Sequence, residues 1–387
     1  MDYNQRALEV HKAYPGKIAM VSTVQCVNAD DLATVYSPGV AQPCREIAAD
    51  ESQVYTYTSK SHTVAVVSDG SAVLGLGNIG AQASLPVMEG KAILFKEFGG
   101  IDAVPLALAT QDLAELEQTI LNLAPAFGGI NLEDIGSPKC FELEARLDAK
   151  LDIPVFHDDQ HGTAIVVAAG LTNALKVVGK QFKQIKVVLN GPGAAGTAII
   201  KMLQALGVKD IIAVDEFGIL YPGRDNLADQ KIMLAETTNA QRLQGDLALA
   251  LDAADVFIGV SVKNVVTPAM IASMATEPIV FAMANPDPEI AYEIAMASGV
   301  AVMATGRSDY PNQINNVVAF PGIFKGALAV QAKSITTEMK LAAVQAIAET
   351  IPAEQISATN IIPSAFDPNV ATNVAQAVGA AWRKGGH

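Results

Sequence analysis

An apolar run leads directly into a glycine-rich turn at Ile185-Lys186-Val187-Val188-Leu189-Asn190-Gly191-Pro192-Gly193-Ala194-Ala195-Gly196. The run predicts a buried strand, and residues 197–206 after the turn predict a helix. The pattern G-x-G-x-x-G in this setting is typical of a dinucleotide-binding turn. Its glycines let the pyrophosphate approach backbone N–H groups at the positive end of the helix. We therefore expect the cofactor to contact Gly191, Gly193, Ala194, Ala195 and Gly196.

The next predicted strand ends in Asp215, 19 positions after Gly196. An acid at this place in the βαβ unit is typical of a carboxylate that binds the ribose diol. Glu216 follows it, and two carboxylates would repel the 2′-phosphate of NADP. No arginine or lysine is adjacent to them in the sequence. The sequence thus favours NAD over NADP as the cofactor.

Apolar runs and helical patterns alternate through most of the chain. Further buried strands are expected at 256–260, 279–284 and 300–305, and others before the glycine turn at 63–68, 103–108, 129–135 and 154–156. This alternation predicts an α/β fold with doubly wound parallel sheet. The length of 387 residues favours two domains. We expect a catalytic domain at 1–160 and a Rossmann-like NAD-binding domain at 161–387, whose C-terminal helices can pack back on the first.

A second G-x-G-x-x-G match occurs at Gly75–Gly80. It lacks an acid at the end of a following strand, so we interpret it as a tight turn. Residues 72–75 before it are expected to form the hairpin partner of the strand at 63–68.

Composition excludes several classes of protein. The net charge of −14 opposes binding to nucleic acid or to an anionic membrane surface. The three cysteines form no CxxC pair, and no apolar run approaches the ~18 residues of a membrane span. The N-terminus has no signal-peptide pattern. We expect a cytoplasmic protein, and the 50% hydrophobic content fits a homodimer or larger homo-oligomer.

Two pairs of acids follow neighbouring predicted strands. Glu133-Asp134 and Asp158-Asp159 should lie at the same edge of a parallel sheet. Clustered carboxylates favour Mg²⁺ or Mn²⁺, although solvated loop acids remain the alternative. His157 and His161 have the spacing of a zinc-protease pair, but the strand-like residues before them disfavour the continuous helix that such a pair needs. We expect the histidines to position other groups.

Several motifs in order resemble the malic enzymes in their short bacterial form. They are Val35-Tyr36-Ser37-Pro38-Gly39-Val40, Val73-Leu74-Gly75-Leu76-Gly77-Asn78-Ile79-Gly80, Pro86-Val87-Met88-Glu89-Gly90-Lys91, Asn131-Leu132-Glu133-Asp134-Ile135, Val155-Phe156-His157-Asp158-Asp159-Gln160-His161-Gly162-Thr163-Ala164, Asn285-Pro286 and Asn312-Gln313-Ile314-Asn315-Asn316-Val317. The resemblance implies an N-terminal malic-type domain followed by an NAD-binding domain. It also implies oxidative decarboxylation of L-malate to pyruvate and CO₂ with NAD(P) and a divalent metal.

The resemblance assigns roles to individual residues. Lys91 would be the general base, Tyr36 the acid that protonates the enolate, and Asp158 the carboxylate that orients Lys91. The implied metal ligands are Glu133, Asp134 and Asp159. The implied substrate or nicotinamide contacts are Asn285 and one of Asn315 and Asn316.

Two departures from the family pattern keep alternatives open. Val73 stands 18 positions before Lys91, where long eukaryotic forms carry an arginine that binds the malate carboxylate. Backbone N–H groups of residues 78–80 are one candidate replacement. Pro192 removes an N–H from the nucleotide turn. A metal-dependent oxaloacetate decarboxylase that needs no NAD is therefore the main alternative, and a regulatory protein on an inactive scaffold is a second.

Overall fold

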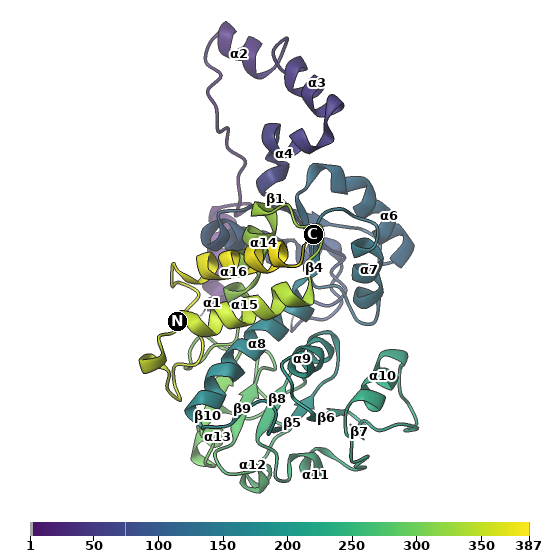
Figure 1. Cartoon of the computed structure of the whole chain (residues 1–387), viewed down its shortest axis with the longest axis vertical. Helices are drawn as coiled ribbons and strands as arrows, with labels where there is room; N and C mark the ends of the chain where they lie inside the picture. Colours follow the sequence, from purple (N-terminus) through teal and green to yellow (C-terminus); the bar gives the residue numbers. More distant parts are fainter. Residues whose placement is uncertain (1–2, 74, 387) are drawn as a thin grey trace.

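The computed structural model describes residues 3–73 and 75–386. Two lobes, each built on a parallel sheet, lie one above the other, and an N-terminal arm extends away from both (Figure 1). Within these residues no helix combines the length and the apolar character that a bilayer crossing requires.

The first lobe contains a four-stranded parallel sheet with the order β2-β1-β3-β4. Its strands are β1 (Thr63–Ser68), β2 (Asp102–Ala107), β3 (Gly129–Leu132) and β4 (Val155–His157). The connecting helices are α5 (Ala81–Leu94), α6 (Leu113–Leu123) and α7 (Lys139–Asp148). Because all four strands are parallel, their carboxyl ends share one edge, where the acids of residues 133–134 and 158–159 follow β3 and β4.

The predicted hairpin at residues 72–75 is wrong. β1 lies between β2 and β3 and is parallel to both, so neither of its edges is free for an antiparallel partner. Val73 instead forms an isolated bridge with Gly77 inside the glycine turn.

The second lobe contains a six-stranded sheet with the order β10-β9-β8-β5-β6-β7. Its strands are β5 (Lys186–Asn190), β6 (Asp210–Asp215), β7 (Gly218–Ile219), β8 (Val256–Gly259), β9 (Ile279–Ala282) and β10 (Val302–Thr305). The helices here are α9 (Ala194–Ala205), α10 (Asp229–Thr237), α11 (Leu247–Leu251), α12 (Pro268–Ser273) and α13 (Tyr292–Ala297). Only β7 is antiparallel. The strand order reverses direction at β5, which confirms the doubly wound fold and places a ligand crevice at the turn after β5.

Helix α8 (Asp158–Val177) begins at the edge of the first sheet and runs into the second lobe. Three helices follow the second sheet: α14 (Phe320–Ala329), α15 (Thr337–Thr350) and α16 (Val370–Lys384). Rings of α14 pack against the first lobe, with Phe320 4.6 Å from Phe95 and Phe324 5.9 Å from Phe156 between centroids. The C-terminal helices thus return to the first lobe, and one hydrophobic core includes residues of both sheets.

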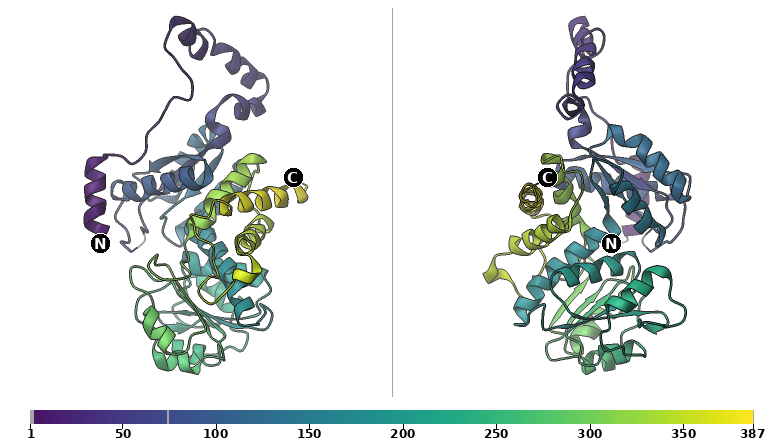
Figure 2. Two further views of the ribbon diagram at one scale, coloured as in Figure 1. Left: turned by 90° about the vertical axis from the view of Figure 1, so that its left-hand side faces the viewer. Right: turned by 45° about the vertical axis from the view of Figure 1, so that its right-hand side comes forward.

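The N-terminal arm carries α1 (Tyr3–Ala13), α2 (Ala29–Val35), α3 (Ala41–Ala49) and α4 (Val54–Tyr57), none of which has a buried residue. Both views in Figure 2 show α2 and α3 far from the two sheets. Short single-turn segments complete the chain: η1 (Glu51–Gln53), η2 (Ser59–His62), η3 (Phe95–Gly99), η4 (Ala124–Ala126), η5 (Asn316–Val318) and η6 (Ala353–Gln355). Lys17 fastens the base of the arm to α5, donating its backbone N–H to Glu89 and its ammonium to the carbonyl of Pro86.

Candidate active site

Lys91 lies at the carboxyl edge of the first sheet, enclosed by acids. Its Nζ is 2.6 Å from Oδ2 of Asp158 and 2.9 Å from Oε1 of Glu133. Its ammonium also stands over the face of Phe320, 4.4 Å from the ring centroid. Burial alone lowers the pKa of Lys91, but the charges of Asp158 and Glu133 outweigh it and raise the pKa above its ordinary value. The sequence prediction that Asp158 orients Lys91 agrees with these contacts.

Three carboxylates converge beside Lys91. Glu133, Asp134 and Asp159 each offer an oxygen within 4.8 Å of the others. The backbone N–H of Asp134 donates to Oδ2 of Asp159 at 2.8 Å, which joins the ends of β3 and β4. Burial raises the pKa of Glu133, and so does the charge of Asp159. Oxygen ligands under such mutual repulsion fit a hard divalent cation such as Mg²⁺ or Mn²⁺.

Asp158 is completely buried and held from two further sides. Asn316 donates to Oδ2 of Asp158 at 2.6 Å. Gly162 makes room for the other oxygen, because a Cβ at Gly162 would lie 1.9 Å from Oδ1 of Asp158. Among the described residues, the side chain of Asn315 makes no hydrogen bond to Asp158. It accepts the N–H of Val317 and caps the N-terminus of η5. Of the two candidate asparagines, Asn316 is the one that contacts Asp158.

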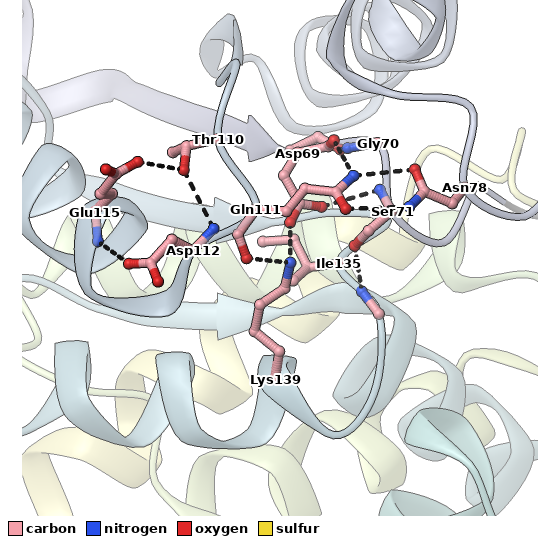
Figure 3. Close-up of polar contacts among 12 residues, drawn as sticks. Asp69, Gly70, Ser71, Asn78, Thr110, Gln111, Asp112, Glu115, Ile135 and Lys139 are labelled. Carbon is pink, nitrogen blue, oxygen red and sulfur yellow. Dashed lines mark hydrogen bonds and ion pairs between the residues drawn. The ribbon is translucent and has the colours of Figure 1, made fainter.

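A polar network that the sequence did not reveal supports the turn at 70–80 (Figure 3). Buried Asp69 pairs with Lys139, which also donates to the carbonyl of Gln111 at 3.1 Å. Gln111 and Asn78 exchange amide hydrogen bonds of 3.0 and 3.1 Å. Ser71 accepts the N–H of Gly136 at 2.8 Å. The network fixes the turn against the segment that carries Glu133 and Asp134.

The first glycine turn is structural, as expected. The N–H groups of Ile79 and Gly80 both donate to the carbonyl of Gly70 at 3.1 Å. A side chain at Gly70 would collide with Gly80, whose carbonyl oxygen would be 2.2 Å away. The amides of residues 78–80 were suggested as ligands of the distal substrate carboxylate. Those of Ile79 and Gly80 are already occupied by the carbonyl of Gly70.

The second glycine turn connects β5 to the N-terminus of α9. Gly191 has φ of +97°, and its Cβ would lie 2.6 Å from the carbonyl of Val260. A Cβ at Gly196 would meet the carbonyl of Gly191 at 2.3 Å. At Gly193 a Cβ would meet nothing within 4 Å, so this glycine keeps the space above the turn open. Ala194 and Ala195 start the helix there, which suits a bound pyrophosphate.

Asp215 is not free to meet a ribose, which corrects the charge argument made from sequence. Arg224 donates to both of its oxygens, at 2.8 and 2.6 Å, and Lys231 donates to Oδ2 at 2.7 Å. Burial alone raises the pKa of Asp215, but these two partners outweigh it and lower the pKa. Both cations come from beyond β7, one of them from α10. Only the neighbours of Asp215 enter the charge argument from sequence, whereas Arg224 and Lys231 follow Asp215 by 9 and 16 residues.

Asn285 follows β9 and is exposed at the carboxyl edge of the second sheet. Its Nδ2 lies 3.5 Å from the carbonyl of Met283, and a Cβ at Gly306 would lie 3.3 Å from that same Nδ2. The residue therefore stands on the rim where the nicotinamide half of a dinucleotide is expected.

The two histidines belong to a cluster behind the acids. Glu144 of α7 accepts the backbone N–H of His157 at 2.8 Å and contacts Nε2 of His161 at 2.9 Å. The prediction of a positioning role agrees with this geometry, because Glu144 holds the first turn of α8.

Tyr36 lies apart from the other predicted site residues. It ends α2 on the arm, with 68% of its surface exposed. Among the described residues no contact joins it to Lys91 or to the acids. The fold of a single chain does not bring Tyr36 to the site, so its role as the acid stays a prediction.

The chain matches two families, described as the N-terminal domain of malic enzyme over residues 15–119 and the NAD binding domain of malic enzyme over residues 160–382. A bifunctional malic/malolactic enzyme of Bacillus subtilis is 55% identical over 98% of this chain and 93% of its own. A probable NADP-dependent malic enzyme of Rickettsia prowazekii is 51% identical over 97% of this chain and 51% of its own. The crystal structure of an NAD-dependent malic enzyme from Thermotoga maritima has 50% identity and a TM-score of 0.93, covering 96% of this chain and 98% of that one.

Proposed function

Because the chain belongs to the malic enzyme family, we propose that it oxidises and decarboxylates L-malate to pyruvate and CO₂ with reduction of NAD. The observation that carries the proposal is the placement of Lys91, which contacts Asp158 and Glu133 beside the cluster of three acids. An oxaloacetate decarboxylase would need the acids but not the intact nucleotide turn.

Lys91 acts as the base that removes the proton of the C2 hydroxyl. Asp158, together with Asn316, holds the ammonium in place, and the ring of Phe320 covers one side of it. A lysine accepts a proton only in its neutral form, so the carboxylate charge that raises its pKa has to be offset. A divalent cation held by Glu133, Asp134 and Asp159 would offset this charge and polarise the substrate oxygens.

A nicotinamide ring bound along the turn at 191–196 would supply the hydride acceptor. Asn285 stands on the same rim and would contact the ring or the substrate. Pro192 lacks an N–H, and the N–H of Gly193 donates to the carbonyl of Gly191 at 2.9 Å, but Ala194 and Ala195 present theirs on the helix end that would receive the pyrophosphate.

NAD is the preferred cofactor in this proposal, with NADP as a usable second. The carboxylate of Glu216, next to Asp215, opposes a 2′-phosphate, whereas Arg224 and Lys231 bring two positive charges to the same place. A 2′-phosphate could pair with either cation. The relatives differ in their cofactor, since those named above include an NAD-dependent and a probable NADP-dependent enzyme.

The decisive assay supplies the purified protein with L-malate, Mn²⁺ and either NAD or NADP, and follows the reduced cofactor and the products. We expect reduced cofactor and pyruvate in equal amounts, with NAD used more efficiently. Pyruvate from oxaloacetate without any nucleotide, and no reaction with malate, would instead establish the decarboxylase. Lactate is measured too, because the Bacillus subtilis relative is named a malic/malolactic enzyme.

We further propose that Tyr36 acts in the site of a second copy of this chain. The arm that carries it exposes Met20 at 92%, Val21 at 80% and Val27 at 80% of their surfaces. So much apolar surface on one segment is typical of a protein–protein contact. Among the described residues no tyrosine pairs with Lys91 or stands beside its ammonium, so a homodimer that exchanges arms would supply the missing acid.

Complementation between two inactive variants tests this exchange. Tyr36→Phe and Lys91→Ala should each lower turnover by about 10²-fold or more. If each site takes Lys91 from one chain and Tyr36 from the other, a mixed dimer has one intact site. Random mixing should then restore about a quarter of wild-type activity. If both residues act within one chain, mixing restores nothing. Lys96→Ala, at an exposed neighbouring lysine, is the control.

A further inference from the structure

A cavity of about 250 Å³ lies where the two lobes meet, behind the first turn of α8. Four helices contribute charged or polar residues to its lining: Glu144 and Asp148 from α7, Gln160 and His161 from α8, Lys201 from α9, and Lys340 from α15. The cavity is separate from Lys91 and from the cluster of three acids, none of which lines it. No step of the proposed reaction uses it.

Hydrogen-bond donors in this cavity lack acceptors. Gln160 is only 3% exposed, and its Nε2 has no hydrogen-bond partner among the described residues. Lys340 points into the same space, and no ion pair or hydrogen bond of its ammonium occurs in the described part of the chain. A buried amide without an acceptor is unfavourable, so Gln160 indicates a missing partner, and the half-buried Lys340 brings its ammonium to the same space.

The charges around Lys340 support the same conclusion. Burial lowers the pKa of Lys340, and the positive charge of Lys201 lowers it further, while Glu144 and Asp148 act in the opposite direction. Glu144 is already engaged, because one of its oxygens accepts the N–H of His157 and the other meets His161. Burial and the charge of Glu144 both raise the pKa of Asp148, which weakens it as a counter-ion.

We propose that this cavity binds a small oxyanion, a carboxylate or phosphate group, through Lys340, Lys201 and Gln160. The anion accepts the hydrogen bonds that these side chains cannot make within the protein, and it separates two lysines that repel each other. Charge-assisted hydrogen bonds of this kind are the stronger ones in proteins. The lining acid Asp148 sets a limit on ligand charge and favours a singly charged group over a highly charged one.

The position of the cavity gives the ligand a regulatory effect. α9 begins at the nucleotide turn, α7 belongs to the first lobe, and α8 begins with Asp158 and Asp159. A ligand held by Gln160 of α8, Lys201 of α9 and Lys340 of α15, beside the acids of α7, favours one relative orientation of the lobes over others. We therefore expect bound anion to change the KM for NAD, with a smaller change in kcat.

The test measures the melting temperature and, by calorimetry, the binding of inorganic phosphate and of acetate to the full chain. Saturating NAD fills the nucleotide turn, divalent metal is omitted, and chloride keeps the ionic strength constant. We expect at least one anion to bind and stabilise the wild type. Lys340→Met and Lys201→Met should each weaken that binding by about tenfold or more. Phosphate alone would indicate a phosphate-bearing ligand, and acetate alone a carboxylate.

The control is Lys209→Met, which removes the same charge from an exposed loop next to α9. It should bind the anion as the wild type does. Lys201 is exposed, so its variant remains informative even if Lys340→Met does not fold. Absence of binding to the wild type, or equal affinity in all three variants, would overturn the proposal.

Discussion

The position of Asp158 depends on the absence of a side chain one helical turn later. Gly162 leaves the space that Oδ1 of Asp158 occupies, while Oδ2 receives Lys91 and Asn316. A buried carboxylate that orients a base must be placed within a fraction of an ångström to be effective. Gly162 is therefore part of the arrangement of Lys91 although it contacts no substrate.

Gly162→Ala should lower kcat by about 10²-fold, because the added Cβ forces Asp158 away from Lys91. The control is Gly170→Ala in the same helix, where the Cβ would meet the flexible end of Ile314 at 3.0 Å and the ring of Phe281 at an ordinary contact distance of 3.5 Å. Steady-state kinetics and thermal unfolding of both variants separate the site effect from loss of stability. Equal kcat in the two variants would contradict the role of Gly162.

Residues that follow strand ends could be predicted to meet, because parallel strands share one carboxyl edge. The convergence of Glu133, Asp134 and Asp159 agrees with that reasoning. Arg224 and Lys231 could not be predicted, since they reach Asp215 by a hairpin and a helix whose path no local pattern specifies. The network of Asp69 and Lys139 joins residues 70 positions apart and is equally invisible in the sequence.

At the scale of elements, the β6–β7 hairpin, the loop after it and α10 are the part of the second lobe that we expect to discriminate between the cofactors. They carry Asp215, Arg224 and Lys231 into contact. Removing Lys231 should free one acceptor position on Oδ2 of Asp215, which Arg224 still contacts, and should remove a partner for a 2′-phosphate.

Lys231→Met should therefore raise the ratio of kcat/KM for NAD over NADP by roughly tenfold. Lys263→Met is the matched control, because Lys263 pairs with Asp287 on the exposed surface of the same lobe. The measurement is the pair of kcat/KM values for each variant. A ratio that is unchanged in Lys231→Met would show that this lysine takes no part in cofactor choice.

The strands of both lobes were predictable because buried parallel strands are continuous apolar runs bounded by turns. The hairpin predicted at 72–75 does not form. Val73 instead belongs to a glycine turn that folds back on Gly70, which the apolar pattern could not reveal. The path of α2 and α3 also could not be predicted, since a helical pattern does not specify what the helix packs against.

At the scale of the whole molecule, the arm is the part that a single chain leaves unpacked. Met20→Asp changes a side chain that is 92% exposed, so it should leave the stability of an isolated chain nearly unchanged. It should weaken self-association by about tenfold or more if Met20 is buried between two copies. Light scattering across a dilution series measures this.

Val262→Asp is the control for that experiment, because Val262 is 64% exposed on the second lobe, away from the arm. Activity per chain should fall together with association in Met20→Asp alone. A dimer of unchanged affinity in Met20→Asp would exclude this segment from the contact.

Helix α8 has a mechanical consequence for the enzyme. Its 20 residues make a rod of about 30 Å with the acids at one end and the core of the second lobe around the rest. A rotation of about 5° at Asp158 would displace the far end by roughly 2.6 Å. We expect the helix to act as a lever with its fulcrum at the acid cluster, so that opening of the crevice at the turn after β5 and loosening of the cluster occur as a single movement.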